Sequence, residues 1–321
     1  MLREFQRAMQ DLDIAGQVLA SDICRTSAAM QAADAGIVVP RVANEAYLPA
    51  LLDAVEQHDV GLLVPLTDLD LLLLAKAREA FARRGCTVMV SSPEAVACCR
   101  DKLRFDDVVA AAGLATGRCV TLAEFRDAPF YPCFAKPIDG SAGIGASRID
   151  NEPALDAHVA RFGSDLVIQD CHDGQEYTID VYRTRAGEIK TIVPRQRLVV
   201  RSGEVEQGLT VRDEALMAAT RQLVDSVDGL WGVMCCQCRR DPGGEPYFFE
   251  LNPRFGGGAP LSIADGADLP RYLLQDVLGR DIGRSVGDFE ENVLMLRYLA
   301  AICVDIDNPA SLRGFDATIF K

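Results

Sequence analysis

A glycine-rich loop at residues 136–145, with the sequence Lys-Pro-Ile-Asp-Gly-Ser-Ala-Gly-Ile-Gly, excludes two common ways of folding around a phosphate group. Strands are predicted at 130–136 and 146–149, so the loop closes a hairpin, whereas Rossmann and Walker loops join a strand to a helix. Glycines let backbone N–H groups approach phosphate oxygens closely. The alternative is a flexible hairpin with a surface lysine. We expect phosphate contacts from Lys136, Gly140, Ser141, Gly143 and Gly145.

A second hairpin is predicted from strands at 232–239 and 246–252, which flank an Asp-Pro-Gly-Gly turn. Glu250 and Asn252 are two residues apart on one strand, so their side chains share a face. Symmetry about the turn places Gln237 directly opposite Glu250. Carboxylate and amide oxygens suit Mg²⁺, which keeps waters or phosphate oxygens in its other positions. We therefore predict these three residues as metal ligands, with a hydrated polar sheet face as the alternative.

Three arginines are placed to meet anionic groups. Arg254 follows the predicted metal ligands and precedes three glycines at 256–258, where it can meet charge that develops on a phosphoryl group. Arg195 and Arg197 fall on one face of a predicted strand and are candidates for binding a reacting carboxylate, with a solvated basic edge as the alternative. Gly257 would let a substrate approach the backbone.

The strand predicted at 165–170 ends in a crossing to the next part of the chain. Backbone groups of Gln169, Asp170 and Cys171 in such a crossing can hydrogen-bond to the edge of an adenine base. Glu176 begins the following strand and can accept hydrogen bonds from ribose hydroxyls, with a surface carboxylate at a strand start as the alternative.

Charge and cysteine content exclude several classes of protein. The net charge of −14 argues against a nucleic-acid-binding protein, although a cleft within it can still be basic. No stretch is typical of a signal peptide or a membrane span. The 11 cysteines lack a disulfide-scaffold spacing, which favours reduced thiols in the cytoplasm. Cys235 and Cys238 face opposite sides of a predicted strand, which disfavours a metal site there.

The first hundred residues alternate strands with helices, and this pattern predicts a small doubly wound parallel sheet. The chain begins with a predicted helix at 2–11, so this βα unit is expected to lack its first strand. A long strand is also predicted at 292–304. The expected strands are 17–22, 36–40, 60–65 and 86–90, and the expected helices are 28–35, 47–58, 69–84 and 93–99.

The order of these motifs resembles the ATP-grasp superfamily. Lys102 at a helix start and Lys136 before the glycine loop are followed by Glu176, by Gln237 and by Glu250-x-Asn252-Pro253-Arg254. The resemblance is greatest to the large subunit of carbamoyl-phosphate synthase and its single-domain relatives. It implies an α/β and α+β fold in which two lobes clamp ATP after a pre-ATP-grasp domain. The implied parts are the pre-ATP-grasp domain at 1–91, the small lobe with the glycine loop at 92–170, and the large lobe with the metal site at 171–321.

The resemblance also implies residue roles. Lys102 and Lys136 would hold the phosphates, Gln169–Cys171 would line the adenine and Glu176 would bind the ribose. Arg254, together with Lys136, would act on the transferring phosphoryl group. Position 169 is often glutamate in such sequences, and glutamine stands here. The cofactors would be ATP and Mg²⁺ or Mn²⁺, held by Gln237, Glu250 and Asn252.

The implied activity is that of an ADP-forming carboxylate–amine ligase. A carboxylate would be activated as an acyl phosphate, and an amine or another nucleophile would then displace the phosphate. The alternatives are a kinase-like phosphotransferase and a non-catalytic ATP-binding subunit of a split carbamoyl-phosphate-synthase-like assembly. The expected partners are small-molecule carboxylates and nucleophiles, without nucleic acid or membrane, in a cytoplasmic protein that forms a homodimer or acts alone.

Overall fold

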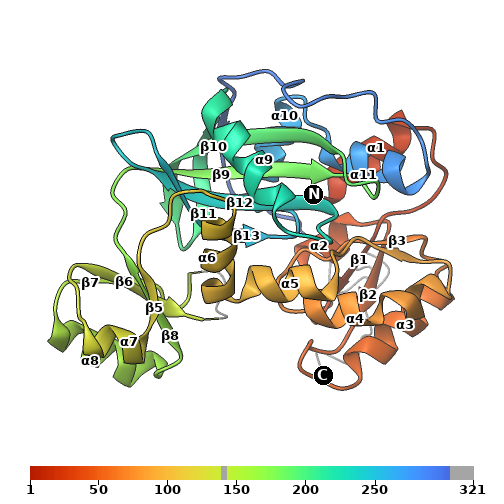
Figure 1. Ribbon diagram of the computed structural model, residues 1–321. Coiled ribbons are helices and arrows are strands. Elements are labelled where there is room, and N and C mark those ends of the chain that lie inside the picture. The colour runs from red at the N-terminus through yellow and green to blue at the C-terminus, as the bar shows by residue number, and fades with distance from the viewer. Residues whose placement is uncertain (139–142, 304–321) are drawn as a thin grey trace.

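The structure is a computed structural model, and it describes residues 1–138 and 143–303. Figure 1 shows an N-terminal part in red and orange, a small lobe in yellow and green, and a large lobe in green to blue that lies above both. Helices α5 (Pro93–Arg100) and α6 (Lys102–Ala111) run between these parts. The three parts therefore meet around α6 and the edge of the large sheet.

The N-terminal part has parallel strands in two pairs, β1 with β2 and β3 with β4. Its core is formed mainly by apolar side chains of α3 and α4, such as Leu51, Leu74 and Phe81. The predicted alternation of strands and helices is confirmed, and the strands are shorter than expected. The elements are β1 (Leu19–Asp22), α2 (Ala28–Ala32), β2 (Ala35–Val38), α3 (Tyr47–Gln57), β3 (Leu62–Leu63), α4 (Leu71–Ala82) and β4 (Thr87–Val88).

Helix α1 (Leu2–Asp11) lies apart from this sheet and packs against α11 (Leu269–Val277) of the large lobe. Phe5 meets the ring of Phe255 edge-on at a centroid distance of 5.8 Å. Arg7 forms an ion pair with Asp268 at 3.1 Å. The first helix therefore packs against the segment that follows Arg254, and Gln6 also donates a hydrogen bond to Asp34 of the N-terminal part at 3.1 Å.

The small lobe is a four-stranded antiparallel sheet with the order β5-β8-β6-β7. As predicted, the glycine-rich loop joins two paired strands, because Ala135 of β6 lies opposite Ser147 of β7. Helices α7 and α8 cover the sheet, and Phe125 and Leu155 fill the space between. The elements are β5 (Cys119–Thr121), α7 (Leu122–Asp127), β6 (Cys133–Pro137), β7 (Ser147–Ile149), α8 (Glu152–Phe162) and β8 (Leu166–Asp170).

The large lobe is built on a six-stranded antiparallel sheet with the order β13-β12-β9-β10-β11-β14. Helix α9 packs on this sheet, and α10 leads from the glycines at 256–258 into α11. The elements are β9 (Gln175–Arg183), β10 (Ile189–Arg201), β11 (Glu204–Thr210), α9 (Glu214–Asp225), β12 (Gly232–Arg240), β13 (Pro246–Asn252), α10 (Ala259–Ala264) and β14 (Leu294–Leu296).

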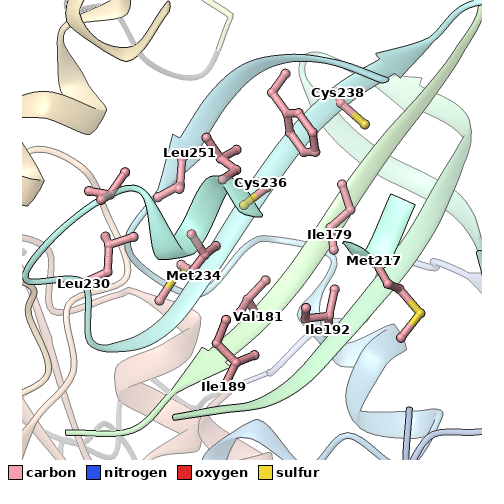
Figure 2. Packing of buried hydrophobic residues seen from close by; sticks show 14 of the residues in the cluster. Ile179, Val181, Ile189, Ile192, Met217, Leu230, Met234, Cys236, Cys238 and Leu251 are labelled. Atoms are coloured by element: carbon pink, nitrogen blue, oxygen red, sulfur yellow. The ribbon is translucent and has the colours of Figure 1, made fainter. Parts of the chain in front are cut away.

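One face of this sheet is apolar and the other is polar. On β12, Met234, Cys236 and Cys238 belong to the main hydrophobic core, which Figure 2 shows together with Ile179 and Val181 of β9. The alternate residues of β12, among them Gln237, point to the opposite face. Because side chains alternate along a strand, one face stabilises the lobe and the other is free for chemistry.

The boundary predicted at 92 stays a prediction, whereas the expected length of the last strand changes. Helices α5 and α6, which the predicted boundary at 92 gives to the small lobe, contribute Cys99 and Phe105 to the core of the large lobe. The long strand predicted at 292–304 is wrong in length, because only 294–296 pair with β11 and 297–303 form no strand. Apolar character alone suggested the longer strand, yet Leu299 is fully exposed.

Candidate active site

The polar face of the large sheet forms one wall of a cavity of about 580 Å³, which lies between the two lobes. This volume is within the range of about 300–1,000 Å³ that small-molecule sites have. Among the described residues that line it, eight are arginine or lysine and six are aspartate or glutamate. A locally basic cavity therefore exists in a chain with a net charge of −14, as anionic ligands would require.

Nearly all of the predicted site residues converge on this cavity, although they come from all parts of the two lobes. Gly145 is the exception, because its backbone lies against Pro137 and Phe162. Gly140 and Ser141 lie outside the described residues. The predicted residues that line the cavity are Lys102, Lys136, Gly143, Gln169, Asp170, Cys171, Glu176, Arg195, Arg197, Gln237, Glu250, Asn252, Arg254 and Gly257.

Two lysines reach the cavity from the small-lobe side. Asp101 caps α6 by accepting hydrogen bonds from two backbone N–H groups, which fixes Lys102 in the first turn. The ammonium of Lys102 donates to the carbonyl of Ile138 at 3.0 Å, and that of Lys136 donates to the carbonyl of Phe249 at 3.4 Å. Burial lowers the pKa of Lys136 from 10.5 to about 8, and Glu250 acts against this shift. An anion placed beside Lys136 would favour its charged form.

The predicted pairing of Gln237 with Glu250 is confirmed. The turn is not symmetric, however, because Cys238 pairs with Phe248 and leaves Phe249 as a bulged residue. The bulge shifts the register by one residue between the turn and the site. Glu250, Asn252 and Gln237 all line the cavity as a result.

Arg254 lies at the end of this hairpin and forms a two-pronged ion pair with Asp68 of the N-terminal part. Its Nε and Nη2 atoms donate to the two carboxylate oxygens of Asp68 at 2.7 and 2.6 Å. Its Nη1 atom donates to the carbonyl of Phe255 at 2.9 Å. The sequence did not point to Asp68, because 186 positions separate the partners.

Glu176 lies between two arginines at the crossing into the large lobe. One carboxylate oxygen pairs with Arg197 Nε at 3.0 Å, and the other pairs with Arg239 Nη2 at 2.8 Å. Gly174 is required in this crossing, because its φ of +126° suits glycine and a Cβ would collide with the carbonyl of Arg240. A ribose contact of Glu176 stays a prediction, as does a substrate contact of Arg197.

Asp170 in the same crossing pairs with Arg118. The Arg118 Nη2 atom lies 2.6 Å from one carboxylate oxygen, and the Arg118 backbone N–H donates to the other at 2.7 Å. These contacts occupy the side chain of Asp170, and its backbone N–H donates to the carbonyl of Arg118 at 3.0 Å, so a contact of this crossing with a base stays a prediction.

Arg195 is more deeply buried than Arg197 on the same strand. Its side chain is 1% exposed and pairs with Asp180, which is 0% exposed, at 2.9 Å. Ser262 donates a further hydrogen bond to Asp180 at 2.7 Å. The guanidinium also lies against Gly258, where a Cβ would collide with it. Arg195 is therefore held in a buried ion pair while it also lines the cavity, and a substrate contact of Arg195 stays a prediction.

Other lining residues were missed by sequence reasoning. Asp106 follows Lys102 by four residues on α6 and Arg239 follows Gln237 by two residues on β12. Helix and strand periodicity applied to the predicted residues would have found both. Glu204 begins β11 and lies against Gly257, and no local pattern marks it.

Replacement of Asp106 by asparagine is expected to make stability less dependent on pH. Burial, together with Asp107, raises the pKa of Asp106 from 3.8 to about 6. Because the folded state holds this proton more tightly than the unfolded chain, the stabilising contribution is present below pH 3.8 and is lost as the pH rises through about 6. The difference in melting temperature between D106N and wild type should therefore be more positive at pH 7.5 than at pH 4.5.

The matched control for this measurement is D127N, which changes an exposed aspartate at the end of α7. Its melting temperature should follow that of the wild type at both values of pH. An equal effect of D106N at both pH values would show that burial does not hold the proton on Asp106.

The predicted metal ligands fit an ion whose other ligands are waters or phosphate oxygens. Residues 1–138 and 143–303 contain no group of three His, Cys, Asp or Glu side chains that could hold a metal by themselves. Glu250 is a carboxylate, and Gln237 and Asn252 offer amide oxygens. Such a set suits Mg²⁺ when phosphate oxygens and waters complete the coordination.

Two family models match this chain. Residues 163–299 match the model described as ATP-grasp in the biosynthetic pathway with Ter operon. Residues 1–89 match the model described as the PylC-like N-terminal domain. No match was found among curated proteins.

Solved structures show the same fold at low sequence identity. The biotin carboxylase domain of Hydrogenobacter thermophilus 2-oxoglutarate carboxylase, solved with MgADP, ADP and bicarbonate, is 18% identical with a TM-score of 0.72, over 91% of this chain and 70% of that one. L-Amino acid ligase from Bacillus licheniformis is 18% identical with a TM-score of 0.68, over 87% and 71%. N5-Carboxyaminoimidazole synthetase from Staphylococcus aureus is 16% identical with a TM-score of 0.67, over 88% and 75%.

The described part of the chain contains no helix with the length and apolar character that a membrane crossing needs.

Proposed function

Because the chain has an ATP-grasp fold with a PylC-like N-terminal domain, we propose that it is an ATP- and Mg²⁺-dependent, ADP-forming ligase. It would activate a carboxylate as an acyl phosphate, which an amine or another nucleophile then attacks. One observation carries this proposal: Lys102, Lys136, Arg254 and the Gln237–Glu250–Asn252 set line the same cavity.

The roles of the side chains follow from where they lie in the cavity. Lys102 and Lys136 would bind phosphate oxygens, and the buried position of Lys136 strengthens its interaction with an anion. Glu250, Asn252 and Gln237 would hold Mg²⁺, which supplies charge neutralisation at the phosphates. Arg254 would bind the phosphoryl group as it moves. Positioning and charge stabilisation, without a protein nucleophile, would therefore account for catalysis.

The test is a phosphate-release screen with ATP and Mg²⁺ over carboxylic acids and amines, singly and in pairs. A ligase gives ADP and phosphate only when an acid and a nucleophile are both present. A phosphorylated product that persists without a nucleophile would indicate the kinase-like alternative. MgATP binding without turnover on any pair would contradict the ligase and favour a non-catalytic subunit.

A further inference from the structure

The ion pair between Arg254 and Asp68 joins the predicted catalytic centre to the N-terminal domain. Asp68 lies in the loop between β3 and α4, whereas Arg254 follows β13 of the large lobe. The two side chains are 18% and 13% exposed, so water screens the pair only weakly. Both carboxylate oxygens are used, and this geometry fixes the plane of the guanidinium as well as its position.

The Asp68 loop is itself held in place at two points. The Arg100 guanidinium, just before α6, donates to the backbone carbonyl of Asp68. Two residues later, Asp70 is buried and accepts a hydrogen bond from the hydroxyl of Tyr47 at 2.7 Å. The carboxylate of Asp68 is therefore presented to Arg254 from a fixed backbone rather than from a mobile surface loop.

The contacts leave part of the guanidinium available. An arginine has five N–H donors in a rigid plane. Two of them bind Asp68 and one binds the carbonyl of Phe255. Two donors remain, and Arg254 lines the cavity together with the predicted metal ligands. Because these three hydrogen bonds fix the plane of the guanidinium, they also fix the direction of the other two donors.

We propose that Asp68 is a positioning residue, through which the N-terminal domain orients Arg254 toward the phosphoryl group that is transferred. This inference rests on the proposed function, because it takes the cavity to be a nucleotide site. Asp68 would not touch the nucleotide itself. Its loss should spare the binding of MgADP and weaken only the added binding of a group that mimics the phosphoryl group in transfer.

Isothermal titration calorimetry measures the affinity for MgADP with and without fluoroaluminate. Fluoroaluminate mimics a phosphoryl group during its transfer. Wild type should bind MgADP more tightly when fluoroaluminate is added. D68N should bind MgADP within about twofold of wild type and should lose about tenfold or more of the added affinity. R254M should lose the same gain, and the D68N/R254M double variant should lose no more than R254M alone, because the two residues act as one unit.

The matched control is F81L, which changes a fully buried side chain in the core of the N-terminal domain, at the end of α4 that is remote from the Asp68 loop. It leaves a small cavity in that core, so its melting temperature should fall while its fluoroaluminate gain stays at the wild-type value. This control distinguishes an effect of lower stability in the N-terminal domain from an effect on the orientation of Arg254.

Three outcomes would overturn the inference. D68N could keep the full fluoroaluminate gain while its melting temperature falls, which would make the pair a structural contact only. The losses of D68N and R254M could add in the double variant, which would show independent action. Wild type could bind no MgADP or gain nothing from fluoroaluminate, and in that case the proposed function would fall together with the inference.

Discussion

Substitution of Glu250 by glutamine is expected to reduce ATP-dependent phosphate release by roughly 10²- to 10³-fold, the usual effect of removing one group that stabilises charge in a transition state. Glu250 is the carboxylate of the predicted ligand set, and glutamine keeps its size while removing its charge. Mg²⁺ would then be held by three amide oxygens, and half-saturation with Mg²⁺ should need a higher concentration. The measurement is phosphate release at increasing Mg²⁺ with the acid and nucleophile found in the screen.

The matched control for this variant is E245Q, an exposed glutamate at the turn of the same hairpin. It removes the same charge from the protein without changing the cavity, so its activity and its Mg²⁺ dependence should remain those of wild type. E250Q activity above about a tenth of wild type, with an unchanged Mg²⁺ dependence, would contradict the metal assignment.

Substitution of Arg195 by methionine is expected to destabilise the large lobe by about 3–5 kcal/mol, the usual cost of leaving one member of a buried ion pair without its partner. Asp180 would then keep only its hydrogen bond from Ser262. The melting temperature of the purified protein, followed by near-UV circular dichroism, measures this effect. The double variant R195M/D180N removes the stranded charge and should recover part of the loss.

R201M is the control for this prediction. Arg201 lies on the same strand and pairs with Glu206 at 3.0 Å, but its side chain is 78% exposed. Exposed pairs contribute about 0–1 kcal/mol, so R201M should melt close to wild type. An R195M protein as stable as R201M, with weaker binding of the carboxylic acid, would instead support the substrate role that the sequence suggested for Arg195.

Local spacing predicted the parts of the site that short segments determine. The hairpin of 232–252 brings Gln237 opposite Glu250, and the i, i+2 rule places Asn252 on the same face. The turn symmetry used for this prediction gave the right pair although the hairpin contains a bulge at Phe249. The pairing near the turn and the pairing at the site differ by one residue, and a sequence pattern does not show where such a bulge lies.

Contacts between distant segments were beyond sequence reasoning. Nothing near Asp68 marks it as the partner of Arg254, because their meeting depends on how the N-terminal domain docks on the large lobe. Arg195 and Arg197 share a sequence pattern but differ in setting, since Arg195 reaches a buried aspartate and Arg197 reaches Glu176. Alternation along a strand gives the face of a side chain, and the depth of burial comes from the tertiary packing.

The two faces of β12 have separate roles: one packs in the core and the other lines the cavity. Met234, Cys236 and Cys238 hold the lobe together, while the residues between them, such as Gln237, line the cavity. Substitutions on the cavity face can therefore change which ligand is accepted without loosening the protein. A deletion of one residue would exchange the two faces and remove both properties at once. Such a strand can diversify by replacement of single residues, whereas changes in its length would be eliminated by selection.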